Sequence, residues 1–215
     1  MDTGIVRAWV DGWAVSRGAA PPVEKPWGFT VDVGLPGHVT RHVLLDADEP
    51  LVRGLAETVA APGTWLKACV APEVMSSWLT PAWTLRAPGF LMSAPLRPSV
   101  TDLPAGYRLR AWSRGGVTRA LVLDKDGAFA ARGQTACPSG SGSVVFDQIE
   151  TAPAHRRRGL GRAVMHNLAD AAIAAGARTG VLAATADGRG LYESLGWTTH
   201  APLTGVFLDP AGTGR

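Results

Sequence analysis

The chain has 215 residues, of which 46% are hydrophobic and 18% charged, a balance that predicts a globular protein with a sizeable core and excludes a disordered one. No apolar run reaches the roughly 18 residues that a membrane-spanning helix needs, and the N-terminus lacks the basic-then-apolar layout of a secretory signal. The two cysteines, Cys69 and Cys137, are too few for a disulfide framework and lack zinc-ligand spacing. We therefore expect a cytoplasmic protein with no metal and no membrane partner.

The formal net charge of +3 arises in the second half of the chain. Residues 1–100 carry 8 basic and 9 acidic side chains, a net charge of −1, whereas residues 101–215 carry 13 and 9, a net charge of +4. Much of this excess lies in residues 156–158 and Arg162. Nucleic-acid-binding proteins more often spread basic residues over a face, with aromatic side chains between them. Charge concentrated at one turn favours a small polyanion, so we expect no nucleic-acid partner.

The first half of the chain alternates helix and strand patterns. Apolar residues at helical spacing, followed by Gly18, predict a helix over residues 3–18. After it, in order, we predict strands over 27–33 and 38–46 joined by a Gly/Pro turn, a helix from 48 or 49 to the break at Pro62, a strand over 65–70, a short helix over 72–79 and a strand over 83–92. Residues 96–105, which contain Pro98 and Pro104, predict a linker.

The second half starts with four successive β patterns. They cover residues 107–112, 117–124, 128–136 and 144–151, and each break between them contains glycine, as hairpin turns do. A tight loop of three arginines and two glycines follows, and then a helix over residues 160–175. The order ends with a short apolar strand over 181–185, a short helix over 187–195 and β structure over 197–208, interrupted at Pro202 and Gly205.

The loop between the fourth strand and the long helix has the chemistry of a phosphate site. The first N–H groups of a helix have no partner within it, glycine lets the backbone approach a ligand closely, and arginine adds charge-assisted hydrogen bonds. A P-loop would need a Gly-Lys-Ser/Thr ending, which is missing. A dinucleotide-binding turn would need a third glycine, and Val164 stands there. The pattern leaves either a phosphate cradle or an ordinary solvated basic turn.

The order of elements around this loop resembles the GNAT superfamily of acyl-CoA-dependent N-acyltransferases. Arg156, Gly159 and Gly161 match its acyl-CoA signature, and residues 191–197, Leu-Tyr-Glu-Ser-Leu-Gly-Trp, match its second signature. The resemblance covers about residues 106–208. It implies an α/β fold with a mixed, mostly antiparallel sheet flanked by helices, and acetyl-CoA as the co-substrate.

The resemblance also implies the residues of the donor site. Backbone N–H groups from Arg157 to Arg162 would hold the pyrophosphate of coenzyme A, and a backbone N–H near Ile149 would polarise the acyl carbonyl. The pantetheine arm would add to the edge of the strand where it splays from its neighbour. The implied coenzyme A-binding residues are Ile149, Glu150, Thr151, Arg156, Arg157, Arg158, Gly159, Leu160, Gly161 and Arg162.

Tyr192 and Asp147 are the residues that we expect to move protons. In the resembled family, a tyrosine at the position of Tyr192 protonates the leaving thiolate; the alternative is a tyrosine that only fills the core. An ammonium acceptor must also lose a proton. Asp147 is our candidate base, because strand alternation would place it on the face of Ile149 and Thr151, with Glu150 on the other face. Glu150, together with His155 and His200, remains an alternative.

Two positions depart from the family pattern. Thr151 stands where the family usually has valine. Thr185 stands where it often has an asparagine that bonds the pantetheine arm. The second departure weakens one expected contact without excluding donor binding.

The first half lacks the glycine loop, but one segment echoes the second half. Residues 83–88, Trp-Thr-Leu-Arg-Ala-Pro, resemble residues 197–202, Trp-Thr-Thr-His-Ala-Pro, and the same order of elements precedes both. We therefore predict a domain over 106–215, a linker over 96–105, and a smaller α/β half over 1–95. That smaller half is either a degenerate GNAT-like repeat or an accessory domain.

The sequence thus predicts an acetyltransferase that moves an acetyl group from acetyl-CoA to the amine of a small-molecule acceptor. Two alternatives come from other classes. One is a catalytically inactive acyl-CoA-binding protein, and the other is a nucleic-acid-binding module that uses the basic turn. The sequence does not name the acceptor, and a homodimer is left open.

Overall fold

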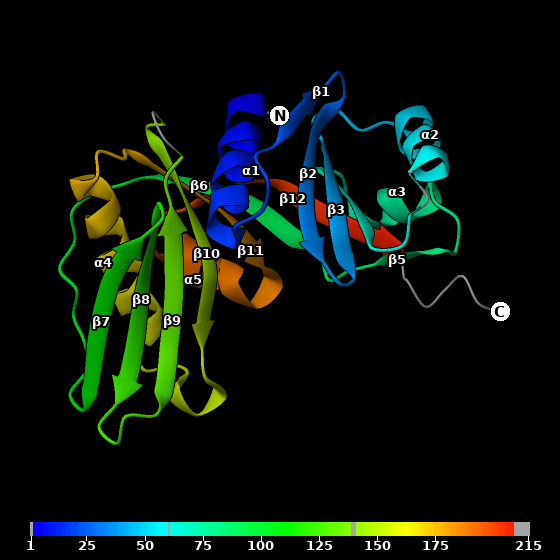
Figure 1. Cartoon of the computed structure of the whole chain (residues 1–215). Coiled ribbons are helices and arrows are strands. Elements are labelled where there is room, and N and C mark those ends of the chain that lie inside the picture. Colours follow the sequence, from blue (N-terminus) through cyan, green and yellow to red (C-terminus); the bar gives the residue numbers. More distant parts are fainter. Residues whose placement is uncertain (1, 60, 139–140, 209–215) are drawn as a thin grey trace.

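A computed structural model describes residues 2–59, 61–138 and 141–208, and shows one long, mixed, largely antiparallel sheet flanked by helices (Figure 1). The helices are α1 (Thr3–Arg17), α2 (Glu49–Thr58), α3 (Pro72–Ser77), the 3-10 turn η1 (Pro153–His155), α4 (Leu160–Ala174) and α5 (Ala186–Ser194). The strands are β1 (Val23–Lys25), β2 (Gly28–Leu35), β3 (His38–Leu44), β4 (Thr64–Ala68), β5 (Trp83–Leu85), β6 (Gly89–Pro95), β7 (Tyr107–Arg114), β8 (Val117–Asp124), β9 (Phe129–Ala136), β10 (Ser143–Thr151), β11 (Thr179–Thr185) and β12 (Thr198–Leu208). The predicted fold class is confirmed.

Most predicted elements are present with bounds shifted by a few residues. Three differences stand out. The short strand β1 was not predicted, because its three residues are all exposed and carry no apolar alternation. The single strand expected over 83–92 is wrong, since the chain leaves the sheet at residues 86–88 and divides it into β5 and β6. The interruption expected at Pro202 and Gly205 is wrong, since β12 runs through both without a break; its register shifts earlier, between Thr199 and Ala201.

The two halves of the chain exchange their last strands. The strand order is β1-β2-β3-β4-β12-β6-β11-β10-β9-β8-β7, and β5 pairs with β12 beside β4. β12 from the second half therefore pairs with β4, and β6 from the first half pairs with β11. Among the strands of the described residues, only β3–β4 and β10–β11 are parallel pairs. The two halves form one continuous sheet, and residues 209–215 of the predicted second domain lie outside the described residues.

Helix α1 lies between the two ends of this sheet (Figure 1). Asp2 caps its first turn, and Gly18 ends it with a left-handed φ of 63°. Its apolar face buries Val6, Trp9 and Trp13 against β2, β3, β10 and β11. Helices α4 and α5 cover the opposite face of the second half, and α2 and α3 cover the opposite face of the first half. Helix α1 therefore packs against strands of both halves of the chain.

A bulge in β10 changes which side chains share a face. Asp147 pairs with Gln134 and Glu150 pairs with Arg132, so the register shifts by one residue between them, and Gln148 adopts a left-handed φ of 55°. Paired residues point to the same side of a sheet. Asp147 and Glu150 therefore both face the α1 side, while Ile149 packs among the side chains beneath α4. The expectation that Asp147 shares a face with Ile149 is wrong, because the extra residue of the bulge reverses the alternation.

Candidate functional site

Strands β10 and β11 separate where the bulge begins. Their parallel pairing runs from Ser143 opposite Thr179 to Phe146 opposite Leu182 and then stops. Beyond that point β10 continues beside β9 alone, and β11 continues beside β6 alone. The edge of β10 from residue 148 to Thr151 is therefore left without a strand partner on the side of β11. The expected splay is present, and it offers backbone groups to an extended ligand.

The N-terminus of α4 opens onto the end of this splay. Gly159 is its N-cap, with a left-handed φ of 80°, and no side chain caps the helix. A Cβ added at Gly159 would meet no atom within 4 Å. Leu160 buries its side chain in the core, so only its backbone N–H remains for a ligand. Free helix N–H groups above open space suit an anion such as a pyrophosphate.

Gly161 has a different reason to be glycine. A Cβ there would lie 2.9 Å from Leu191 Cδ2 and 3.7 Å from Thr151 Oγ1. The first turn of α4 thus approaches both β10 and α5, which brings the two sequence signatures together in space. A side chain at this position would have to displace Leu191.

The arginines of the loop are exposed, and two of them are tied to their surroundings. Arg156 Nε donates to the Thr151 carbonyl at 3.4 Å, and Arg158 Nη1 donates to the Tyr107 hydroxyl at 3.3 Å. Arg157 holds a left-handed φ of 60°, rare for a residue with a side chain. Arg162 is exposed on the first turn of α4. The loop therefore presents cationic side chains around its free N–H groups.

The first half has the same element order but not this site. β3 and β4 stay paired from Thr40 to Leu44 without a splay, and α2 begins at a side-chain cap. Asp48 Oδ1 accepts from the Leu51 N–H at 2.9 Å, and Glu49 adds a second negative charge in the first turn. The Asp48 carboxylate takes up an N–H group that could bind a phosphate, and the negative charges of Asp48 and Glu49 would repel a phosphate at this helix start. The predicted absence of a glycine loop in this half thus has a structural counterpart.

Tyr192 lies on α5 with only 7% of its surface exposed. Its ring packs near Trp197, with ring centroids 6.1 Å apart. Burial, and secondarily the negative charge of Asp147, raise the pKa of Tyr192 to about 12. The phenol is therefore protonated at neutral pH and can serve as a proton donor.

Asp147 is held by α1. Arg17 donates to it twice, from Nε to Oδ2 at 2.5 Å and from Nη2 to Oδ1 at 2.9 Å, and Ser16 Oγ donates to Oδ2 at 2.7 Å. Gln134 Nε2 in turn donates to Ser16 Oγ at 2.7 Å. Ser16, Arg17 and Gln134 were not predicted as site residues. No local signal marks them, because Arg17 and Asp147 lie 130 positions apart in the sequence.

The other acid and the two histidines lie in different surroundings. Glu150 is half exposed and paired with Arg132 at 2.7 Å. His155 Nδ1 is hydrogen-bonded to the Tyr107 hydroxyl at 3.0 Å, near the start of β7. His200 Nε2 is hydrogen-bonded to Ser93 Oγ at 2.8 Å. Thr185, where the family often has asparagine, caps α5 by accepting from the Gly188 N–H at 3.1 Å. None of these hydrogen bonds and ion pairs of the four side chains involves Asp147 or Tyr192.

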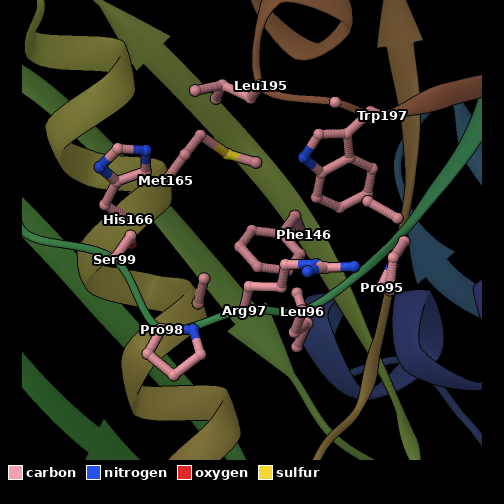
Figure 2. A pocket seen from close by; sticks show the side chains of 13 residues that line it. Pro95, Leu96, Arg97, Pro98, Ser99, Phe146, Met165, His166, Leu195 and Trp197 are labelled. Carbon is pink, nitrogen blue, oxygen red and sulfur yellow. The ribbon is translucent and has the colours of Figure 1, made fainter.

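A cleft of about 1020 Å³ lies on the α1 side of the sheet, beside the bulge. Its lining comes from the C-terminal turn of α1, the tip of the β2–β3 hairpin, the β7–β8 hairpin, β9 and Gln148. A smaller cavity of about 390 Å³ lies on the opposite side, between α4, residues 195–197 after α5 and residues 95–99 (Figure 2). Phe146, Met165 and Trp197 contribute apolar walls, and Arg97 and His166 contribute polar ones. The cleft, not the cavity, adjoins the ion pair of Asp147.

Within the described ranges, no group of three metal-ligating side chains gathers in one place. No helix in the described part of the chain is long and apolar enough to cross a membrane.

Comparison with known proteins agrees with this geometry. Residues 117–199 match the family model described as an acetyltransferase (GNAT) domain, and no curated protein matches the sequence. Among solved structures, the chain is similar to a GCN5-related N-acetyltransferase from Kribbella flavida, with a TM-score of 0.67, 18% identity and coverage of 98% of this chain and 96% of that one. A GCN5-related N-acetyltransferase from Sphaerobacter thermophilus gives a TM-score of 0.57 at 12% identity, covering 97% and 93%.

A third solved structure is a tandem GNAT protein from the clavulanic acid biosynthesis pathway. It gives a TM-score of 0.54 at 15% identity, covering 72% of this chain and 66% of that one. At these identities the structural likeness speaks for the fold, while the family model speaks for the domain. Residues 117–199 are therefore a GNAT acetyltransferase domain, set in a chain whose fold is that of the GNAT proteins.

Proposed function

We propose that this chain transfers the acetyl group of acetyl-CoA directly to the amine of a small-molecule acceptor. The GNAT domain over residues 117–199 supports acyl transfer as the reaction class. The single observation that carries the donor is the uncapped start of α4 at the mouth of the β10–β11 splay.

The chain's own groups fit the donor. The N–H groups of residues 157–162 bind the pyrophosphate, with Arg157 and Arg162 adding positive charge. The open backbone edge from Ile149 to Thr151 holds the pantetheine arm by strand-like hydrogen bonds. Glu150 takes part in this through its backbone only, because its side chain turns to Arg132.

In this proposal, the acetyl transfer takes place at the bulge of β10. The amine nitrogen bonds to the acetyl carbon, the carbon–sulfur bond breaks, and one proton leaves the amine while one reaches the thiolate. A backbone N–H near Ile149 polarises the carbonyl. Tyr192 donates to the departing sulfur, because its raised pKa of about 12 keeps the phenol protonated. Neither Cys69 nor Cys137 lines the cleft, so the transfer is direct.

The acceptor of the amine proton stays a prediction. Asp147 adjoins the cleft and its charge acts on Tyr192, but its oxygens already accept from Arg17 and Ser16. We propose that it acts first as the residue that fixes α1 against β10. The Glu150, His155 and His200 alternatives are each engaged elsewhere.

We also propose that residues 1–95 are a degenerate GNAT-like copy, joined by a linker over 96–105 to the domain over 106–215. The repeated element order and the Asp48 cap on α2 support a copy that has lost coenzyme A binding. Its remaining role is to wall the acceptor cleft, to which α1 and Leu35 contribute.

Thiol release from acetyl-CoA, measured with a panel of amines and combined with mass spectrometry of the products, tests the proposal. We expect an acetylated amine and stoichiometric free thiol. Tight coenzyme A binding in calorimetry with no product from any amine would favour the inactive binder instead. Loss of coenzyme A binding in the double variant Arg157→Ala/Arg158→Ala, with no salt-dependent DNA binding by the wild type, excludes the nucleic-acid module.

A further inference from the structure

The cleft beside the bulge has an unusual charge balance. Its lining contains no acidic side chain but four arginines, Arg17, Arg114, Arg119 and Arg132. Arg17 and Arg132 are neutralised by Asp147 and Glu150. Within the described residues, Arg114 and Arg119 have no carboxylate within ion-pair distance. The cleft therefore carries uncompensated positive charge.

The position of Arg119 makes this charge relevant to a ligand. Arg119 is half-buried on β8, paired with Trp112 of β7 on one side and with Gln134 of β9 on the other. Paired residues share a face, so Arg119 lies on the same face as Trp112, which is 46% exposed, and Gln134, whose amide binds Ser16. A half-buried guanidinium offers five donors, and an anion that takes them up recovers the hydration they have lost.

The charge also extends outward from the cleft. Arg108, Arg110, Trp112 and Arg114 alternate along β7 and pair with residues of β8 on this same open face. Strong positive potential at the entrance of a cleft raises the local concentration of anions and repels a cationic amine. An acceptor without a negative group would enter against this field.

Resting on the acetyl transfer proposed above, we infer that the acceptor is an amine that also carries an anionic group, a carboxylate or a phosphate. Its anion binds Arg119, with Arg114 beside it, and its amine reaches the bulge at Gln148. β8 and β10 are two strands apart, about 10 Å. The amine and the anion are therefore separated by several bonds, as in an ω-amino acid, rather than adjacent as in glycine.

A matched series of acceptors tests this inference. The probes are ω-amino acids from glycine to 6-aminohexanoate, each compared with its neutral amide, and O-phosphoethanolamine compared with ethanolamine to separate phosphate from carboxylate. We expect kcat/KM for the best anionic member to exceed that of its amide by tenfold or more, with an optimum at a chain longer than glycine. Arg119→Gln should reduce this ratio towards one, and Arg119→Lys should restore part of it.

Arg178→Gln is the matched control, because Arg178 is exposed in the turn before β11, away from the cleft, and only its backbone N–H and carbonyl are engaged. Circular dichroism and Tm of each variant exclude misfolding as the cause. Equal or better turnover of the amides, or an equal loss for both classes in Arg119→Gln, overturns the inference and leaves acetyl transfer standing.

Calorimetry with 6-aminohexanoate in the presence of coenzyme A separates the two proposals further. Arg119-dependent binding without any acetylated product keeps the anion site and removes the transferase. Absence of both binding and turnover removes both. Steeply salt-dependent binding of a single-stranded DNA oligonucleotide that depends on Arg119, with no anionic amine accepted, assigns the face to nucleic acid and overturns the inference.

Discussion

The Arg17 guanidinium and the Asp147 carboxylate form a two-point ion pair that joins the last turn of α1 to the bulge of β10. Two parallel N–H···O bonds fix orientation as well as distance. Helix α1 packs against both halves of the sheet. The pair therefore links the first half, through α1, to the strand that is proposed to hold the donor.

The first prediction concerns this pair. If Asp147 positions α1, then Arg17→Gln and Asp147→Asn should lower kcat by similar factors, about tenfold, and leave the acidic limb of the kcat/KM pH profile in place. Steady-state kinetics between pH 5 and about 9 measure this. Loss of the acidic limb in Asp147→Asn alone would identify Asp147 as the general base and contradict the positioning role.

Tyr192→Phe should lower kcat about 100-fold with little change in the Kd for coenzyme A, because it removes a proton donor and keeps the ring in place. The raised pKa of about 12 means that the wild-type phenol loses its proton only at strongly alkaline pH. The wild type should therefore show no basic limb due to Tyr192 below about pH 10. An unchanged kcat in the variant would reduce Tyr192 to a core residue.

Gly159→Ala should weaken coenzyme A binding and also lower stability by about 1–2 kcal/mol, since φ is 80° at this position and a side chain disfavours the left-handed region. Calorimetry and urea denaturation give the two quantities. Gly190→Ala in α5 is the control: it has open space and no positive φ, so stability should rise slightly and coenzyme A binding should be unaffected.

Lys67 predicts a rise in stability with pH. Burial, reinforced by the charge of Arg41, lowers the pKa of Lys67 to about 7. Between that value and the ordinary 10.5, the unfolded chain binds the proton and the folded chain does not, so the free energy of unfolding increases with pH, by at most about 1.4 kcal/mol per pH unit. Urea titrations at several pH values check this. Lys67→Met should flatten the rise, while Lys125→Met, at an exposed lysine, should leave it unchanged.

The sequence predicted the features that short-range chemistry determines. Helical spacing located α1 and α4, glycine turns located the β7–β10 hairpins, and the Arg156–Gly161 pattern located the uncapped helix start. The bulge at Gln148 escaped prediction because the expectation assumed unbroken strand alternation through residues 147–151. It lies where the register against β9 shifts, next to the Asp147 carboxylate that Arg17 binds.

The cleft escaped prediction because its lining residues come from distant parts of the sequence. Its arginines come from α1, β7, β8 and β9, and in the sequence they look like scattered solvated charges. Only the pairing of Trp112 with Arg119, and of Arg119 with Gln134, brings them to one face. The sequence-based expectation of one basic turn thus missed a second basic region.

The exchange of β6 and β12 has a consequence for how the chain folds. β4 pairs with β12, which begins at Thr198, more than a hundred residues later in the chain. One edge of β4 therefore has no partner strand during most of synthesis on the ribosome. Pairings of such long sequence separation form slowly and leave strand edges exposed to aggregation. The protein should therefore acquire its native state only after the last strand has emerged, and fragments cut within residues 96–105 should be poor folding units.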